Sequence, residues 1–165
     1  MSNIQGSFPK TRLRRNRMKD FSRRLVAENN LNTDDLILPL FVCEGNNVED
    51  PIQSMPGINR YSIDKLLHKV EEAVRFSIPA IAIFPQIEPG LKNAEGSLAY
   101  DENNLVCRSI KNIKKEFSEI GVICDVALDP FTDHGHDGLV INDKIDNDKT
   151  LDILEKQALA QVNAG

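Results

Sequence analysis

The fold of this 165-residue chain is constrained most by three short apolar runs, each followed by a stretch with helical periodicity. The runs cover residues 36–42, 80–84 and 122–128. Continuous apolar runs of this length are typical of parallel strands that are buried on both faces. Strands that alternate with helices predict an α/β fold with a parallel sheet and right-handed crossovers. The chain is therefore expected to contain an N-terminal arm followed by three strand–loop–helix units.

The expected helices follow from apolar residues at helical spacing. They cover about 16–28, 63–76, 102–118 and a last helix that starts within 146–150. Ser62 is the expected N-cap of the second helix, and residues 43–60 are expected to form a long loop. Pro39 cannot donate to a sheet ladder, so a bulge or an unpaired position is expected there. A small hairpin is expected around Asn142. The apolar stripe of the arm helix contains Met18, Phe21 and Leu25, and that of the last helix contains Leu151, Leu154, Ala158 and Val162.

The third apolar run leads into the stretch CDVALDPFTDHGHDG, residues 124–138. Carboxylates and imidazoles at the mouth of an apolar strand are expensive to desolvate unless they are paired, hydrogen-bonded or metal-bound. In α/β barrels, functional residues follow the C-terminal ends of the strands. A solvated acidic loop is the plainer alternative. The ionisable side chains of this loop are Asp129, Asp133, His134, His136 and Asp137.

The same stretch resembles the active-site loop of the porphobilinogen synthase (5-aminolevulinate dehydratase) family. Zinc-type members of that family carry the pattern D-x-C-x-C followed by G-H-C-G. Here Ala127, Asp129 and Asp137 stand at the three cysteine positions, as in the magnesium-type members. The rest of the pattern is kept by Asp125, His134, Gly135, His136 and Gly138, and further matches lie at 12–17, 34–42, 55–57 and 82–85.

The resemblance implies a fold and a reaction. The fold is the N-terminal portion of a (β/α)8 TIM barrel, with an oligomerisation arm over residues 1–30 and three βα units over 31–165. Such barrels need about 250 residues. The implied lyase (dehydratase) condenses two molecules of 5-aminolevulinate to porphobilinogen in heme biosynthesis. It does so through Schiff bases on two lysines of later strands. Lys92 is at a position that is usually lysine in the family, but no lysine here stands in a matching Schiff-base motif, so the chain alone is expected to be inactive.

The resemblance also implies roles for individual residues. Asp125 is implied as a supporting catalytic group, and Asp129 and Asp137 as ligands of Mg²⁺ or another hard cation, which prefers oxygen donors. Thr132, His134 and His136 are implied to belong to the active-site loop. From the residues alone, a zinc site at the two histidines stays open, as does simple hydrogen bonding of their rings within the loop. A three-thiolate zinc site is excluded.

Charge is distributed unevenly along the chain. Residues 10–24 contain eight basic residues and one acidic residue, so that stretch carries +7 of a formal net charge of −5 and the rest carries −12. A basic arm can bind nucleic acid or an acidic surface of a sister subunit. The resemblance favours the second partner, a homo-oligomer (an octamer in the family), with no nucleic acid. The arm, residues 1–28, is thus expected to pack on a neighbouring subunit.

No run is long enough for a membrane span, and the first residues lack the apolar core of a signal peptide. The cysteines Cys43, Cys107 and Cys124 are odd in number and form no C-x-x-C pair, which indicates reduced thiols and a cytoplasmic location. The alternative to the enzyme is a non-catalytic half that acts as a scaffold or association module. Both hypotheses predict association through the arm and the open edge of the sheet.

Overall fold

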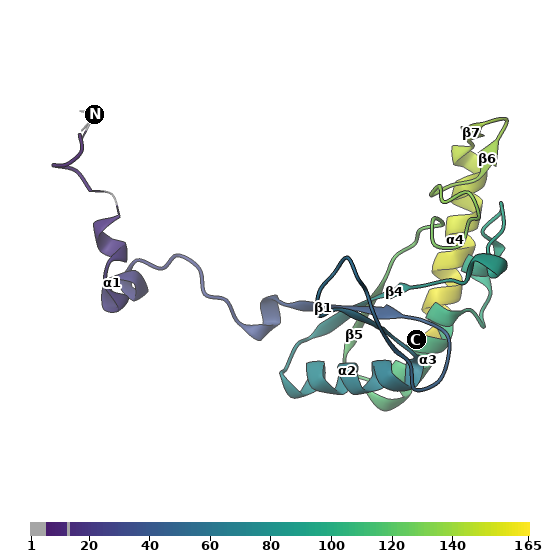
Figure 1. Cartoon of the computed structure of the whole chain (residues 1–165), viewed down its shortest axis with the longest axis horizontal. Coiled ribbons are helices and arrows are strands. Elements are labelled where there is room, and N and C mark those ends of the chain that lie inside the picture. The colour runs from purple at the N-terminus through teal and green to yellow at the C-terminus, as the bar shows by residue number, and fades with distance from the viewer. Residues whose placement is uncertain (1–5, 13) are drawn as a thin grey trace. The chain divides into compact units, whose positions relative to one another are not determined.

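The computed structural model describes residues 6–12 and 14–165 (Figure 1). Contacts between Cα atoms divide the chain into two compact units, Met1–Asn32 and Thr33–Gly165. The expected arm over residues 1–30 falls partly on residues 1–5 and 13, which lie outside the described residues. Within the described ranges, no helix is long and apolar enough to cross a membrane.

The first unit contains a 3-10 turn, η1 (Arg15–Arg17), and a short helix, α1 (Asp20–Leu25). The predicted helix over 16–28 is therefore wrong in length. Lys19 has extended backbone angles, φ −117° and ψ 149°, and separates the two pieces. A helix of six residues is not stable by itself, because so few hydrogen bonds follow its nucleation. The large apolar side chains of this unit are mostly exposed: Phe8, Met18, Phe21 and Leu25.

The second unit is built on a five-stranded sheet with the order β2-β3-β1-β4-β5. The three main strands run parallel, and α2, α3 and α4 alternate with them, which confirms the predicted α/β class. The strands are β1 (Ile37–Val42), β2 (Glu49–Pro51), β3 (Asn59–Tyr61), β4 (Ala80–Pro85) and β5 (Gly121–Cys124). The helices are α2 (Ile63–Arg75), α3 (Leu105–Glu116) and α4 (Asn147–Ala164).

The expected bulge at Pro39 and the expected long loop are corrected, whereas the unpaired position expected at Pro39 is present on the β3 side of β1. The β1–β4 register runs through Pro39, which lies opposite Ala82, so there is no bulge. On the other side of β1, the pairs with β3 involve Phe41 and Val42 and do not reach Pro39. The expected loop over 43–60 contains β2 and β3, which pair with each other in antiparallel fashion. Both strands are only three residues long and β2 is fully exposed, so neither shows as an apolar run.

The core lies between one face of the sheet and the helices α2 and α3 (Figure 1). Alternate strand residues point into it, as the pleat requires. The opposite face is open, and Ile37 and Ile123 on it are about half exposed. The buried contacts come from Leu40, Val42, Ile81 and Ile83 of the strands and from Leu66, Val70, Ile110 and Ile113 of the helices. The open face is the one that a barrel would turn inward.

The predicted N-cap of α2 is correct in position but not in bonding. The Ser62 side chain makes no capping hydrogen bond to a backbone N–H of α2. Its hydroxyl donates to Asp64 Oδ1 at 2.6 Å and accepts from the Val48 N–H at 2.9 Å. Ser62 therefore ties the chain before β2 to the start of α2.

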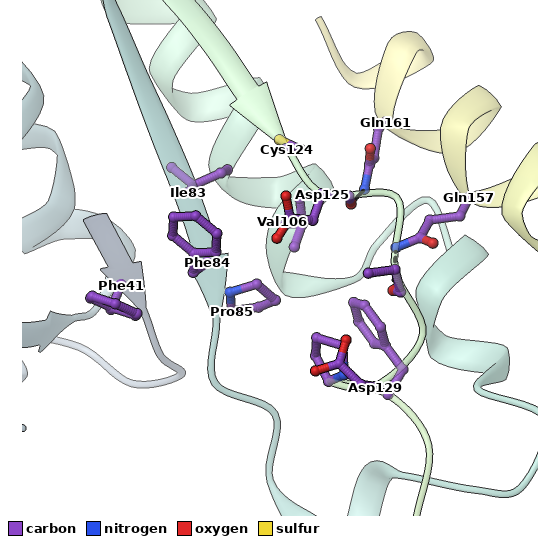
Figure 2. Close-up of a pocket in the computed structure, with 13 residues that line it drawn as sticks. Phe41, Ile83, Phe84, Pro85, Val106, Cys124, Asp125, Asp129, Gln157 and Gln161 are labelled. Atoms are coloured by element: carbon purple, nitrogen blue, oxygen red, sulfur yellow. Dashed lines mark hydrogen bonds between the residues drawn. The ribbon is translucent and has the colours of Figure 1, made fainter. Parts of the chain in front are cut away.

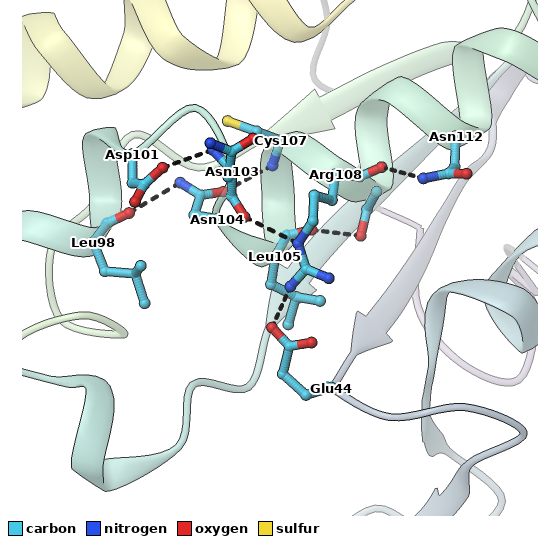
Figure 3. A network of polar contacts seen from close by, with 10 residues as sticks. Glu44, Leu98, Asp101, Asn103, Asn104, Leu105, Cys107, Arg108 and Asn112 are labelled. Carbon is cyan, nitrogen blue, oxygen red and sulfur yellow. Dashed lines mark hydrogen bonds and ion pairs between the residues drawn. The ribbon is translucent and has the colours of Figure 1, made fainter.

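A polar network anchors the connection between β4 and α3 (Figure 3). Asn104 is the buried N-cap of α3, where its Oδ1 accepts from the Cys107 N–H at 2.8 Å. Its amide also donates to the carbonyls of Leu98 and Ala99. Arg108 forms an ion pair with Glu44, at the end of β1. This network holds the loop after β4 at the carboxyl end of the sheet.

The predicted stripe of α4 is confirmed only in part: Leu154 packs against the core and Ala158 is partly buried, but the other two residues are exposed. Leu151 is 62% exposed and Val162 is 73% exposed. The buried residues of α4 are Thr150, Gln157, Ala160, Gln161 and Ala164. Because three of these five are polar, an apolar pattern alone does not identify the buried side of α4. The preceding hairpin, β6 (Val140–Ile141) with β7 (Lys144–Ile145), is as predicted, and Asp146 caps α4 by accepting from the Lys149 N–H.

Candidate functional site

The chain leaves the sheet earlier than the apolar run 122–128 predicts. The last pair of the β4–β5 ladder joins Ile83 to Cys124, so residues 125–128 extend past the sheet. They end in a turn in which the N–H groups of Phe131 and Thr132 both donate to the Leu128 carbonyl at 2.9 Å. We call residues 125–129 the exit segment. It lies at the carboxyl ends of the parallel strands, where ligands bind in α/β folds.

The exit segment lines a cavity of about 230 Å³ at these strand ends (Figure 2). The rings of Phe41 and Phe84 belong to its wall, with centroids 5.6 Å apart. These two residues belong to the open face of the sheet, because they are paired in register two positions beyond Pro39 and Ala82. The other lining residues that matter below are Asp125, Ala127 and Asp129 of the exit segment and Gln157 and Gln161 of α4.

Two of the predicted site residues, Asp125 and Asp129, line the same cavity. They lie four residues apart, with Ala127 between them on the same cavity, and Asp129 stands in the turn that ends the exit segment. Two carboxylates at one cavity make it attractive to a cation or an ammonium group. The predicted grouping of acidic residues at this strand end is thus present, in the form of Asp125 with Asp129.

Asp137 and Thr132 are not among the residues that line the cavity. The Oδ1 of Asp137 accepts a hydrogen bond from the Leu128 N–H at 2.6 Å. Thr132 is 1% exposed, and its hydroxyl donates to the carbonyl of His136 at 2.8 Å. The Asp137 bond joins the loop to the exit segment, and the Thr132 bond joins two parts of the loop to each other.

The His134 ring is hydrogen-bonded within the loop region. Its Nδ1 accepts from the backbone N–H of His136 at 3.1 Å, and its Nε2 lies 3.3 Å from the carbonyl of Ala94. These partners place a proton on Nε2, because a carbonyl can only accept. The rings of His134 and His136 are 5.4 Å apart. With both nitrogens engaged, His134 has no lone pair for zinc in this arrangement, which favours the hydrogen-bonded alternative.

The fit of a metal ion can be judged from the donor groups. Among residues 6–12 and 14–165, no three His, Cys, Asp or Glu side chains are grouped so that they could hold one. Asp129 faces the cavity, whereas Asp137 is engaged with the exit segment's own backbone. The described residues thus do not form a complete cation site, and Asp129 with Asp137 as ligands stays a prediction.

The cysteines are free and do not form a reactive group. Burial raises the pKa of the Cys124 thiol to about 12, with a smaller contribution from neighbouring Cys107. Burial also raises the pKa values of the Cys43 and Cys107 thiols. A thiol that stays protonated is neither a good nucleophile nor a good metal ligand.

Four residues of the cavity were not anticipated from the sequence. Phe41 and Phe84 were assigned only to strands, and the glutamines of α4 only to a helix. Gln157 and Gln161 carried a usable signal, since two long amides one turn apart lie on the same side of a helix.

A parallel sheet with carboxylates and a cavity at its carboxyl ends defines the second unit as part of an α/β barrel. The family model for delta-aminolevulinic acid dehydratase matches residues 10–165. The dehydratase of Bradyrhizobium diazoefficiens is 54% identical over 154 residues, which is 93% of this chain and 44% of that protein. The one of Chlamydia pneumoniae is 41% identical, with coverage of 93% and 46%.

A solved structure of a delta-aminolevulinic acid dehydratase also matches this chain. The Toxoplasma gondii enzyme, crystallised with the reaction product porphobilinogen, matches with a TM-score of 0.88 at 40% identity, over 94% of this chain and 44% of that one. The chain belongs to the delta-aminolevulinic acid dehydratase family. It spans about half the length of these relatives.

The raised thiol pKa of Cys124 predicts a slow, strongly pH-dependent alkylation. A rise from the ordinary value of 9.0 to about 12 lowers the thiolate fraction at pH 8 about 1000-fold. Iodoacetamide labelling of the native chain, followed by peptide mass spectrometry, should show Cys124 reacting at least about 100-fold more slowly than in urea. The rate should still be rising at pH 10. A plateau below pH 10 would contradict the burial of this thiol.

The same shift has a consequence for stability. Between pH 9 and pH 12 the folded chain keeps a proton on Cys124 that the unfolded chain releases. The contribution of the Cys124 thiol to the free energy of unfolding is therefore fully present below pH 9 and is lost as the pH rises toward 12.

Proposed function

We propose that this chain supplies part of the active site of an enzyme that condenses two molecules of 5-aminolevulinate to porphobilinogen. The observation that carries the proposal is the pair Asp125 and Asp129 on one cavity at the carboxyl ends of parallel strands. Family membership and the porphobilinogen bound to the Toxoplasma gondii relative support it.

The cavity suits one end of such a substrate. 5-Aminolevulinate carries an amino group, which is attracted as an ammonium ion to the carboxylates of Asp125 and Asp129. The amine must lose a proton before it can attack a carbonyl carbon, and a carboxylate within reach can accept that proton. Asp125 lies where the exit segment leaves the sheet and is the residue we assign to this role. Phe41 and Phe84 supply an apolar wall that limits access of water.

Further strands are needed to complete this site. The open face of the sheet exposes Ile37 and Ile123, and Val126 on the exit segment is 42% exposed. Apolar side chains in this position are covered by the other strands in a closed barrel. The two Schiff-base lysines that the family resemblance implies belong to those strands. We therefore propose that residues 1–165 contribute binding and proton transfer, but not covalent capture of the substrate.

The arm is proposed to join copies of the enzyme. Phe8, Met18, Phe21 and Leu25 are exposed beside a dense set of arginines. Apolar side chains flanked by charge are typical of surfaces that associate with another chain, and an acidic body of the same sequence is a complementary partner.

The proposed function can be tested in a chimera. Residues 1–165 are fused to the remaining C-terminal part of the Bradyrhizobium diazoefficiens relative, which is 54% identical in the shared region. The chimera should form the pyrrole product from 5-aminolevulinate, and the 165-residue chain alone should not. Asp125→Asn should lower kcat by at least about 100-fold, because the amide cannot accept the proton. Asp152→Asn, on the outside of α4, is the matched control. Enzyme-like turnover by the 165-residue chain, or full activity of Asp125→Asn, would show the proposal to be wrong.

We also propose that the enzyme uses Mg²⁺ or another hard cation and not zinc. The support is the replacement of thiolate positions by Ala127, Asp129 and Asp137, since carboxylate oxygens suit hard cations. A zinc-selective chelator should leave the chimera active, and Mg²⁺ should stimulate it or have no effect.

The matched control for the hard-cation proposal introduces cysteines at the three positions where zinc-type members carry them. The triple variant Ala127→Cys, Asp129→Cys, Asp137→Cys should become sensitive to the same chelator. Loss of the parent chimera's activity on chelation, with recovery on zinc alone, would refute the hard-cation proposal.

A further inference from the structure

The two glutamines of α4 make contacts that the proposed reaction has not used. Gln157 is 1% exposed and Gln161 is 9% exposed. The Nε2 of Gln157 donates to the carbonyl of Ala127 at 3.0 Å, and the Nε2 of Gln161 donates to the carbonyl of Asp125 at 2.8 Å. Figure 2 shows both side chains reaching from α4 to the exit segment.

The two glutamines on α4 are separated by nearly the same distance as the two carbonyls that they bond on the exit segment. Residues four apart on a helix are separated by about 6 Å along its axis, and carbonyls two residues apart in an extended chain by about 6.6 Å. The later glutamine bonds the earlier carbonyl, so the helix and the exit segment run in opposite directions. Two bonds in register fix both the position and the direction of the segment, which a single bond cannot do.

The exit segment needs these partners because it has left the ladder. The last β4–β5 pair is at Cys124, so the carbonyls of Asp125 and Ala127 lie beyond the ladder, and the part-buried bonds from α4 supply their donors. The segment's other anchor is the bond from the Leu128 N–H to Asp137. Helix α4 and the loop therefore hold it from two sides.

Gln157 buries one polar atom, its Oε1, that has no hydrogen-bond partner among the described residues. The amide cannot be turned around, because its oxygen would then face the oxygen of Ala127. A leucine or methionine would fill the same volume without burying an unpaired acceptor. Packing alone therefore does not account for a glutamine here, whereas the bond to Ala127 does.

We infer that Gln157 and Gln161 are positioning residues that hold the exit segment so that the carboxylates of Asp125 and Asp129 face the cavity. They act through the backbone of the segment and need not touch the substrate. The inference rests on the proposed function only for the role of the two carboxylates. Its geometric part concerns the chain itself and is tested on the chain.

Hydrogen–deuterium exchange of the full 165-residue chain provides the test. The double variant Gln157→Leu, Gln161→Leu keeps side-chain volume but removes both bonds. Protection of the Leu128, Phe131 and Thr132 amides should fall at least about tenfold, while β1, β4 and α4 keep theirs. Asn163→Leu, an exposed amide on the same helix, is the control and should change nothing. Unchanged protection at these amides, or an equal loss throughout α4 and the sheet, would overturn the inference.

A second variant keeps the inference testable if the double variant does not fold. In Gln161→Glu a protonated carboxyl can donate to the Asp125 carbonyl, whereas the ionised form repels it, and burial raises the pKa of such a group. Protection factors of the exit segment should be low at pH 8 and recover toward those of the unaltered chain at pH 5. The absence of any pH-dependent recovery would count against a hydrogen-bonding role.

The two proposals fail separately. An inactive chimera with a normal exchange response overturns the proposed function and leaves the positioning role in place. An active chimera whose exit segment does not respond to the glutamine variants overturns the positioning role alone. If both hold, Gln157→Leu in the chimera should lower kcat more than it raises KM, because a displaced carboxylate acts in the chemical step.

Discussion

The site depends on how a polar backbone is satisfied after it leaves the sheet. The β4–β5 ladder ends at Cys124, and beyond it the carbonyls of Asp125 and Ala127 accept hydrogen bonds from side-chain amides of α4. These bonds hold the exit segment at the mouth of the sheet, where Asp125 and Asp129 line one cavity. The bond from Leu128 to Asp137 then turns the chain back.

Much of this could be predicted from residue order. Apolar runs identified β1, β4 and β5 because strands buried by helices on one face and a barrel interior on the other have few polar positions. The acidic residues after the third run indicated where the site lies, since barrels place functional groups there. The motif around Asp125 and residues 134–138 then indicated the family that the sequence and structure comparisons show.

The remainder could not be predicted because it depends on partners far away in sequence. The buried face of α4 is polar at Gln157 and Gln161, which bond carbonyls thirty and thirty-six residues earlier, respectively. The strands β2 and β3 are stabilised by each other and by β1, not by an apolar pattern. In the described part of the first unit, the apolar side chains Met18, Phe21 and Leu25 are exposed, so the apolar stripe of the arm does not report a buried helix face. His134 is bonded to Ala94, forty residues away.

We propose that Asp125 and Asp129 face the reacting molecule from a segment held by α4. A crystal structure of the chimera with porphobilinogen bound is the most direct test. We expect the product to lie in the cavity between Phe84 and the exit segment, with a carboxylate oxygen of Asp125 or Asp129 within hydrogen-bonding distance of its amino group. The bonds from Gln157 and Gln161 should remain in the complex. Product bound away from both carboxylates, or an exit segment detached from α4 in the complex, would contradict this proposal.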